Sequence, residues 1–182
     1  RGLYGEEDIR RLMAAIRGPA RADVCLWRLS ACGSMTYRSE VEKQRLFDPR
    51  APGRAMGEVL QRYDPLAEAV AAARREGLPI YPWITLFDEG FPPSRSRFLD
   101  EHPECQWVDR TGSIYLYGVP CYDYAEAIEF RLRHVREILG YGGDGLYLCL
   151  RSHSYQGCPY RQRDFFGFNE PVAAEYRRRY GV

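Results

Sequence analysis

The sequence predicts an α/β fold with parallel strands, and two observations carry this prediction. Amphipathic helical segments alternate with short apolar runs along the 182 residues. These runs lack the strict alternation of a strand with one wet face, which indicates strands buried on both faces. Helices that alternate with such strands are typical of parallel βαβ units. The length suits one domain over residues 1–182.

All four helical segments have recognisable start signals. The first has an acidic start followed by apolar residues at helical spacing, namely Ile9, Leu12, Met13 and Ile16. The second begins at Asp64, a favourable N-cap residue, and ends at Gly77. The last begins near Asn169 and runs to about Tyr180. Each pattern predicts a helix with one packed face and one solvated face.

The remaining helical segment begins at Asp123, in capping-box spacing with Glu126, and ends at Gly140. Apolar residues recur along it at helical spacing. Its inward face is therefore expected to hold Ile128, Leu132, Val135 and Leu139.

Strands are predicted over residues 24–29, 79–87 and 146–150, where the chain is apolar between turn signals. Pro82 interrupts the second run, and a proline usually marks a strand edge or a bulge. Asp144, just before the third run, is interpreted as a turn or cap residue.

The connections are asymmetric, because helix-to-strand turns are short whereas segments 30–63, 88–122 and 151–168 are long and rich in aromatic and polar residues. Loops of this length are usually functional, and in barrel enzymes the loops after the strands build the active face. The turns contain no GxGxxG or GxxxxGK[ST] motif, which argues against nucleotide-binding folds. We therefore predict a partial (β/α)8 TIM barrel with long loops at the carboxyl ends of its parallel strands.

Composition excludes several function classes. The net charge is +1, with 26 basic and 25 acidic residues, so nucleic acid is not expected as a partner. No apolar run approaches the roughly 18 residues of a membrane span. The six cysteines form no CxxC pair, and neither His102 with Cys105 nor His153 with Cys158 has the second half of a zinc site. No metal and no cofactor is therefore expected.

Glycosidic cleavage generally needs two carboxyl groups beside the bond. Asp88 and Glu89 directly follow the second strand, so at least one is expected at the rim, although both also suit a solvated turn. Glu170 lies in an Asn-Glu-Pro triplet, which is similar to that of a large clan of retaining glycosidases whose glutamate is the general acid/base. The same three residues also suit the start of a helix without any chemistry.

Polar residues also follow the other two strands. Arg151 and His153 stand at the end of the third strand, where an arginine can hold a sugar and a histidine can transfer a proton. Arg28 ends the first strand, and there it can either bind substrate or form a buried salt bridge. Tyr37 and Trp83 belong to a set of aromatic residues around these strand ends, and such rings stack on sugars or fill small loop cores.

These patterns together predict a carbohydrate substrate. The predicted catalytic residues are Asp88, Glu170 and His153. The predicted substrate-binding residues are Arg28, Tyr37, Trp83, Arg151 and Asn169.

Three segments together resemble bacterial barrel proteins of glycosyl-hydrolase-like family ten and its uncharacterised relatives: Tyr81-Pro82-Trp83-Ile84, residues 87–104, and Gly143 to Leu148. The likeness covers most of the chain from about Asp23 onward. It implies a TIM barrel of which this chain, as a fragment, holds the second to fourth strands, with the rest of the barrel outside residues 1–182. The chain starts at Arg1, so we expect the native N-terminus to be absent and the compartment to be undecided.

One position departs from the resembling proteins. Cys149 stands where their strand ends with an aspartate, a candidate nucleophile, and cysteine cannot replace it in ordinary glycosidic chemistry. Three hypotheses follow: a glycoside hydrolase whose carboxylate pair is incomplete in this chain, a non-catalytic saccharide-binding barrel, and a barrel enzyme that uses Arg151 and His153 on an anionic small molecule.

Overall fold

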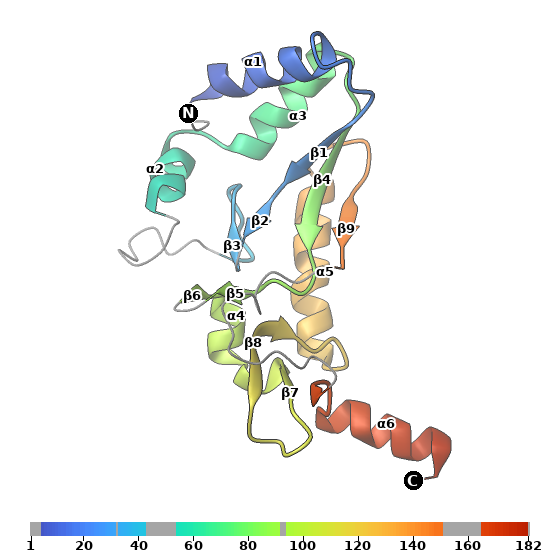
Figure 1. Cartoon of the computed structure of the whole chain (residues 1–182). Coiled ribbons are helices and arrows are strands. Elements are labelled where there is room, and N and C mark those ends of the chain that lie inside the picture. The colour runs from blue at the N-terminus through green and yellow to red at the C-terminus, as the bar shows by residue number, and fades with distance from the viewer. Residues whose placement is uncertain (1–4, 32, 43–53, 92–93, 151–164, 182) are drawn as a thin grey trace. The chain divides into compact units, whose positions relative to one another are not determined.

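The computed structural model describes residues 5–31, 33–42, 54–91, 94–150 and 165–181 (Figure 1). Their contacts divide the chain into two compact units. Unit 1 comprises Arg1–Ser30, Met35–Ile84 and Arg133–Cys149, and unit 2 comprises Ala31–Ser34, Thr85–Leu132 and Leu150–Val182. The single domain over residues 1–182 stays a prediction.

Helices α1 (Glu6–Arg17) and α3 (Pro65–Arg75) pack against each other in unit 1, which also contains α2 (Arg54–Arg62). Ile9 and Met13 of α1 are fully buried, and so is the apolar stripe of α3. Asp64 caps α3, since its Oδ1 accepts a hydrogen bond from Leu66 N at 3.0 Å. Both predicted helices are confirmed.

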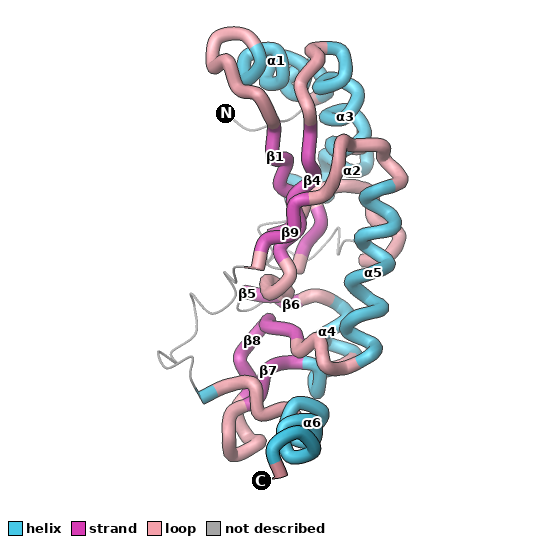
Figure 2. Tube along the Cα trace, turned by 90° about the vertical axis from the view of Figure 1, so that its right-hand side faces the viewer, coloured by secondary structure: helices cyan, strands magenta, loops and turns pink. Residues whose placement is uncertain are grey.

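The central feature of unit 1 is a three-stranded parallel sheet in the order β1-β4-β9, drawn in Figure 2. Its strands are β1 (Cys25–Arg28), β4 (Ile80–Thr85) and β9 (Tyr147–Cys149). In the register of β1 and β4, Cys25 lies opposite Ile80 and Arg28 opposite Trp83. Pro82 therefore lies in the central strand and not at a sheet edge.

The two faces of this sheet differ along β1 and β4, whereas Leu148 of β9, on the face opposite Tyr147, is 48% exposed. Successive side chains of a strand point to opposite faces, so Cys25, Ile80 and Ile84 share one face, and all three are buried. Leu26, on the opposite face, is 46% exposed, and Tyr147 is 44% exposed. The prediction of strands buried on both faces is therefore wrong for the described residues.

Helix α5 (Ala125–Leu139) forms where expected, but its predicted inward face is wrong. Ile128, Leu132 and Leu139 are exposed, whereas the buried residues are Ala127, Phe130, Arg131, His134 and Ile138. Those buried positions also recur at helical spacing, but Arg131 and His134 hide the pattern because they are polar. The polarity of two buried side chains thus misled the assignment of the face.

The predicted loops contain secondary structure of their own. Within 30–63, β2 (Ser30–Ala31) pairs with β3 (Ser34–Met35), and α2 follows. Within 88–122, the antiparallel pairs are β5 (Gly90–Phe91) with β6 (Ser94–Arg95), and β7 (Gln106–Val108) with β8 (Tyr115–Pro120). Between these pairs lie α4 (Arg97–Glu101) and the 3-10 turn η1 (Pro103–Cys105). The chain's last helix, α6 (Glu170–Tyr180), begins and ends as predicted.

The predicted partial (β/α)8 TIM barrel is wrong. Three parallel strands are present, but the described strands of segments 30–63 and 88–122 form separate two-stranded sheets instead of continuing the parallel sheet. Without a barrel, there is no longer a basis for interpreting the chain as strands two to four with the remaining strands outside residues 1–182. No helix in the described residues is long and apolar enough to cross a membrane.

Candidate functional site

The turn that follows β4 is packed inside unit 2. Asp88 and Glu89 are each 0% exposed. Backbone hydrogen bonds hold the turn on three sides: Gly33 N donates to Asp88 O at 3.0 Å, Glu89 N to Gly118 O at 2.8 Å, and Ser96 N to Glu89 O at 2.7 Å. The expectation that one of the two carboxylates lies at a rim is therefore wrong. A catalytic role for Asp88 stays a prediction, and the burial of the Asp88 side chain does not favour this role.

The turn is packed so closely because two glycines lie against it. Gly118 has a φ of 73°, and a Cβ at this position would lie 2.6 Å from Gly90 N. Gly33 also has a positive φ, and a Cβ there would meet the carbonyl of Glu89. Only glycine adopts these conformations readily and leaves room for a second backbone.

Glu89 belongs to a buried polar network in unit 2. Arg131 Nη2 donates to Glu89 Oε1, Arg131 Nε donates to the Tyr122 hydroxyl at 3.1 Å, and that hydroxyl donates to Leu86 O. Burial raises the pKa of Glu89, while the charge of Arg131 and a hydrogen bond from Ser96 oppose this effect. Such a network fixes the turn after β4 against α5 and keeps the Glu89 carboxylate away from solvent.

Glu170 and Asn169 have structural contacts in unit 2. The Glu170 side chain is 77% exposed and pairs with Arg177 at 2.6 Å. Asn169 is 1% exposed; its Nδ2 donates to Gln106 O at 2.7 Å, and its Oδ1 accepts from Val108 N at 3.3 Å. Asn169 therefore fastens the start of α6 to β7 through its side chain, which makes no cap hydrogen bond to the helix.

Tyr37 is also held inside the protein, in unit 1. It is 1% exposed, and its hydroxyl donates to Glu137 Oε2 at 2.7 Å. Ser39 Oγ donates to the same oxygen at 2.7 Å, and the backbone N of Glu40 donates to Glu137 Oε1 at 2.7 Å. The segment around Tyr37 is thus anchored on α5, and we leave Tyr37 out of the candidate site. Arg151 and His153 lie outside the described residues.

The structure brings together two predicted binding residues, Arg28 and Trp83. They lie opposite each other on β1 and β4, and Arg28 Cζ is 5.8 Å from the centroid of the Trp83 ring, a cation-π distance. Arg28 Nε also donates to Ser30 O at 2.8 Å, which orients the guanidinium. Both side chains lie on the open face of the sheet, and Arg28 is exposed while Trp83 is half-buried.

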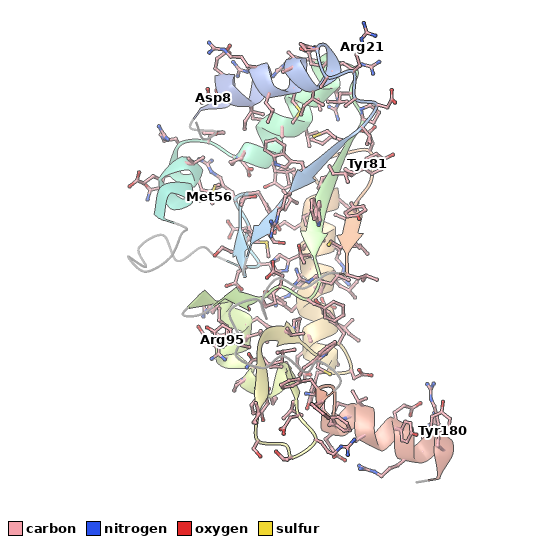
Figure 3. The ribbon with its side chains drawn as sticks, in the orientation of Figure 1. Asp8, Arg21, Met56, Tyr81, Arg95 and Tyr180 are labelled. Atoms are coloured by element: carbon pink, nitrogen blue, oxygen red, sulfur yellow. The ribbon has the colours of Figure 1, made fainter. Side chains whose placement is uncertain are left out.

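Tyr147 of β9 completes this arrangement. Its ring meets the Trp83 ring edge to face, with centroids 5.7 Å apart and planes at 85°. Tyr81 of β4, labelled in Figure 3, shares the face by strand alternation. We call Leu26, Arg28, Tyr81, Trp83 and Tyr147 the aromatic face. The sequence analysis did not name Tyr147 as a binding residue. Side-chain alternation along β9, compared with the position of Trp83 on β4, could have placed Tyr147 on the same face.

The part of the chain that the structure describes contains neither a candidate metal-binding cluster nor a disulfide. No group of three or more His, Cys, Asp and Glu side chains there could hold a metal ion. Cys25, Cys105, Cys121 and Cys149 are free thiols, and burial raises the pKa of Cys105 to about 12. His102 contacts Glu104 at 3.3 Å, while His153 and Cys158 lie outside the described residues.

No family model and no curated protein sequence matches this chain. Among solved structures, the fold is similar to part of an alpha-L-fucosidase isoenzyme 2 from Paenibacillus thiaminolyticus, with a TM-score of 0.56 and 15% sequence identity. The likeness covers 97% of this chain and 26% of that chain, so this chain spans about a quarter of the length of the fucosidase. At this identity the likeness concerns the fold alone.

Proposed function

We propose that this protein binds a carbohydrate on the aromatic face. The observation that carries the proposal is the contact of three side chains from three neighbouring strands: the guanidinium of Arg28 over Trp83, and the edge-to-face pair of Trp83 and Tyr147. Sugar rings have apolar faces that stack on aromatic rings, and hydroxyls that take hydrogen bonds from an arginine. The aromatic face offers both kinds of contact.

The surroundings of Trp83 support binding at this face. The sheet leaves Leu26 and Tyr147 exposed beside it, and exposed apolar groups that cluster on one surface commonly mark a binding site.

Hydrolysis of a glycosidic bond is the second candidate function. The fucosidase with the similar fold is a glycosidase by its name, and the segments that resemble glycosyl-hydrolase-like family ten imply the same class. One observation counts against hydrolysis. A glycosidase needs two carboxyl groups that both reach the substrate, but the Asp88 side chain is buried whereas that of Glu170 is exposed. Cys149, at the position of the family's candidate nucleophile, also favours binding without turnover.

A binding experiment with two tryptophan variants tests the proposal. Affinity electrophoresis of the protein through gels that contain neutral or acidic polysaccharides should show retardation in at least one of them. Trp83→Ala should abolish this retardation, whereas Trp27→Ala should preserve it, because Trp27 is a half-buried tryptophan on the opposite face of β1. Retardation that survives Trp83→Ala, or none in any gel, would contradict the proposal.

Release of reducing ends from the retained polysaccharides separates binding from hydrolysis. The binding function predicts no release. Release that Asp88→Asn or Glu170→Gln abolishes, with folding intact by circular dichroism, would instead establish the glycosidase.

A further inference from the structure

We propose that Cys105 and Cys121 form a disulfide bond across the β7–β8 hairpin when the chain folds in the presence of a disulfide oxidant such as oxidised glutathione. Both residues are free thiols in the structure, which therefore shows the reduced form of this pair. The inference is independent of the proposed function, because both cysteines belong to unit 2 whereas the aromatic face belongs to unit 1.

The two cysteines lie opposite each other at the open end of the hairpin. Gln106 pairs with Pro120, so Cys105 and Cys121 are the next pair in the same antiparallel register. A backbone hydrogen bond supports this pairing, since Cys121 N donates to Cys105 O at 2.6 Å. Residues paired in this way have Cα atoms about 5.5 Å apart and side chains on the same face. Disulfides join Cα atoms at about 4.4–6.8 Å, so the backbone already has the required spacing.

The surroundings of the pair determine when the bond can form. Cys105 and Cys121 are each 1% exposed. Burial raises the pKa of Cys105 to about 12, with the proximity of Cys121 as a smaller cause, and burial raises the pKa of Cys121 as well. Exchange with a disulfide needs a thiolate that the oxidant can reach, so the folded protein reacts slowly. In the unfolded chain both thiols are accessible with a pKa near 8.5, and oxidation therefore accompanies folding.

The reaction with oxidised glutathione is balanced without a further reactant. The thiolate of one cysteine attacks a sulfur of the glutathione disulfide, which forms a mixed disulfide and releases one glutathione thiolate. The thiolate of the other cysteine attacks the protein sulfur of this mixed disulfide, which forms the protein disulfide and releases the second glutathione. The two cysteines thus lose two electrons and two protons, and the two glutathione thiols take them up.

The bond stabilises a hairpin that holds other parts of unit 2. Gly118 O of β8 accepts a hydrogen bond from Glu89 N at 2.8 Å, and Gln106 O of β7 accepts one from Asn169 Nδ2 at 2.7 Å. The hairpin therefore fastens both the turn after β4 and the start of α6. A disulfide that closes the loop 105–121 restricts the unfolded chain and so favours the folded state.

Refolding of the reduced, unfolded chain in a mixture of oxidised and reduced glutathione, followed by alkylation of free thiols, tests the proposal. Trypsin cleaves after arginine and so places the two cysteines in separate peptides, 98–110 and 111–131. Mass spectrometry should find these peptides joined in most of the refolded protein, and reduction with dithiothreitol in urea should separate them. Recovery of both peptides mainly in alkylated form, or joined to peptides of other cysteines, would overturn the proposal.

Oxidation of the chain kept in urea is the control for the role of the fold. The unfolded chain should favour pairs closer in sequence, such as Cys25 with Cys32, because shorter loops close at a lower entropic cost. The yield of the Cys105–Cys121 bond should therefore be several-fold higher after refolding than in urea. Equal yields would show that the hairpin does not direct the bond, and this result would also overturn the proposal.

Thermal unfolding gives a second readout. The oxidised protein should have a Tm about 5–10 °C above that of the reduced protein, the shift expected for closing a loop of this length. Cys105→Ser should remove this difference, whereas Cys149→Ser, which changes a half-buried cysteine outside the pair, should preserve it. An undiminished difference in Cys105→Ser would contradict the proposal. The peptide analysis uses the wild-type chain, so it decides the question even if Cys105→Ser fails to fold.

Discussion

At the scale of single residues, the structure separates side chains that serve the fold from those that face solvent. Asp144 illustrates the first kind: its carboxylate accepts from Ile80 N and its own N–H donates to Ile80 O, both at 2.9 Å. A Cβ at Gly145 would lie 2.8 Å from the ring of Tyr81, so a larger residue there would require this ring to shift. The Gly-Asp-Gly motif, which contributed to the family resemblance, thus has a structural explanation, as the sequence had indicated for Asp144.

Arg131 gives the sharpest prediction at this scale. Arg131→Met should lower the free energy of unfolding by about 3–5 kcal/mol, because it leaves Glu89 buried without its ion pair. Arg133→Met, an exposed arginine on the same helix, should change it by less than about 0.5 kcal/mol. Urea unfolding followed by circular dichroism measures both. Equal stability of the two variants would show that the buried pair does not hold the turn after β4.

At the scale of elements, local signals predicted the main helices and strands well. Asp64 marks the start of α3 because a carboxylate satisfies free N–H groups in the first turn. The face of α5 could not be predicted, since the burial of Arg131 depends on Glu89, which is 42 residues distant in sequence. The β5–β6 and β7–β8 hairpins were missed because they lie in segment 88–122, whose aromatic and polar residues were assigned to a long loop.

The β7–β8 hairpin allows a prediction on pH. Asp109 accepts hydrogen bonds from Ser113 N at 3.0 Å, Ile114 N at 2.8 Å and Thr111 Oγ1 at 2.7 Å. These bonds lower the pKa of Asp109 to about 2, with the Ile114 N–H as the largest cause. A lowered pKa means that the stabilisation is present above the usual pKa of an aspartate, near 4, and is lost as the pH falls toward 2.

Asp109→Asn should therefore have a lower Tm than the wild-type protein at pH 5. The difference should shrink as the pH falls from 4 to 2, because the wild-type carboxylate becomes protonated in this range. Differential scanning calorimetry at several pH values measures it. A difference that stays constant over this range would contradict the role given to the carboxylate.

At the scale of the whole molecule, the chain's parallel strands were predictable but its barrel was not. Apolar runs between helices indicate parallel strands, yet they do not fix how many strands follow or where the long connections lead. The candidate site was predictable in part: Arg28 and Trp83, which the sequence predicts to bind substrate, lie together on neighbouring strands. Asp88, Tyr37 and Asn169 are buried by contacts from segments distant in sequence, which no local pattern reveals.

The central claim is that a saccharide binds at Trp83, and the three tryptophans of the chain provide the most direct measurement. Each indole N–H gives one resolved signal in a ¹H–¹⁵N spectrum, assignable with the variants Trp27→Phe, Trp83→Phe and Trp107→Phe. Titration with neutral and with acidic oligosaccharides should shift the Trp83 signal in at least one case and leave those of Trp27 and Trp107 in place. A shift confined to Trp27 or Trp107, or no shift with any of these ligands, would contradict the account.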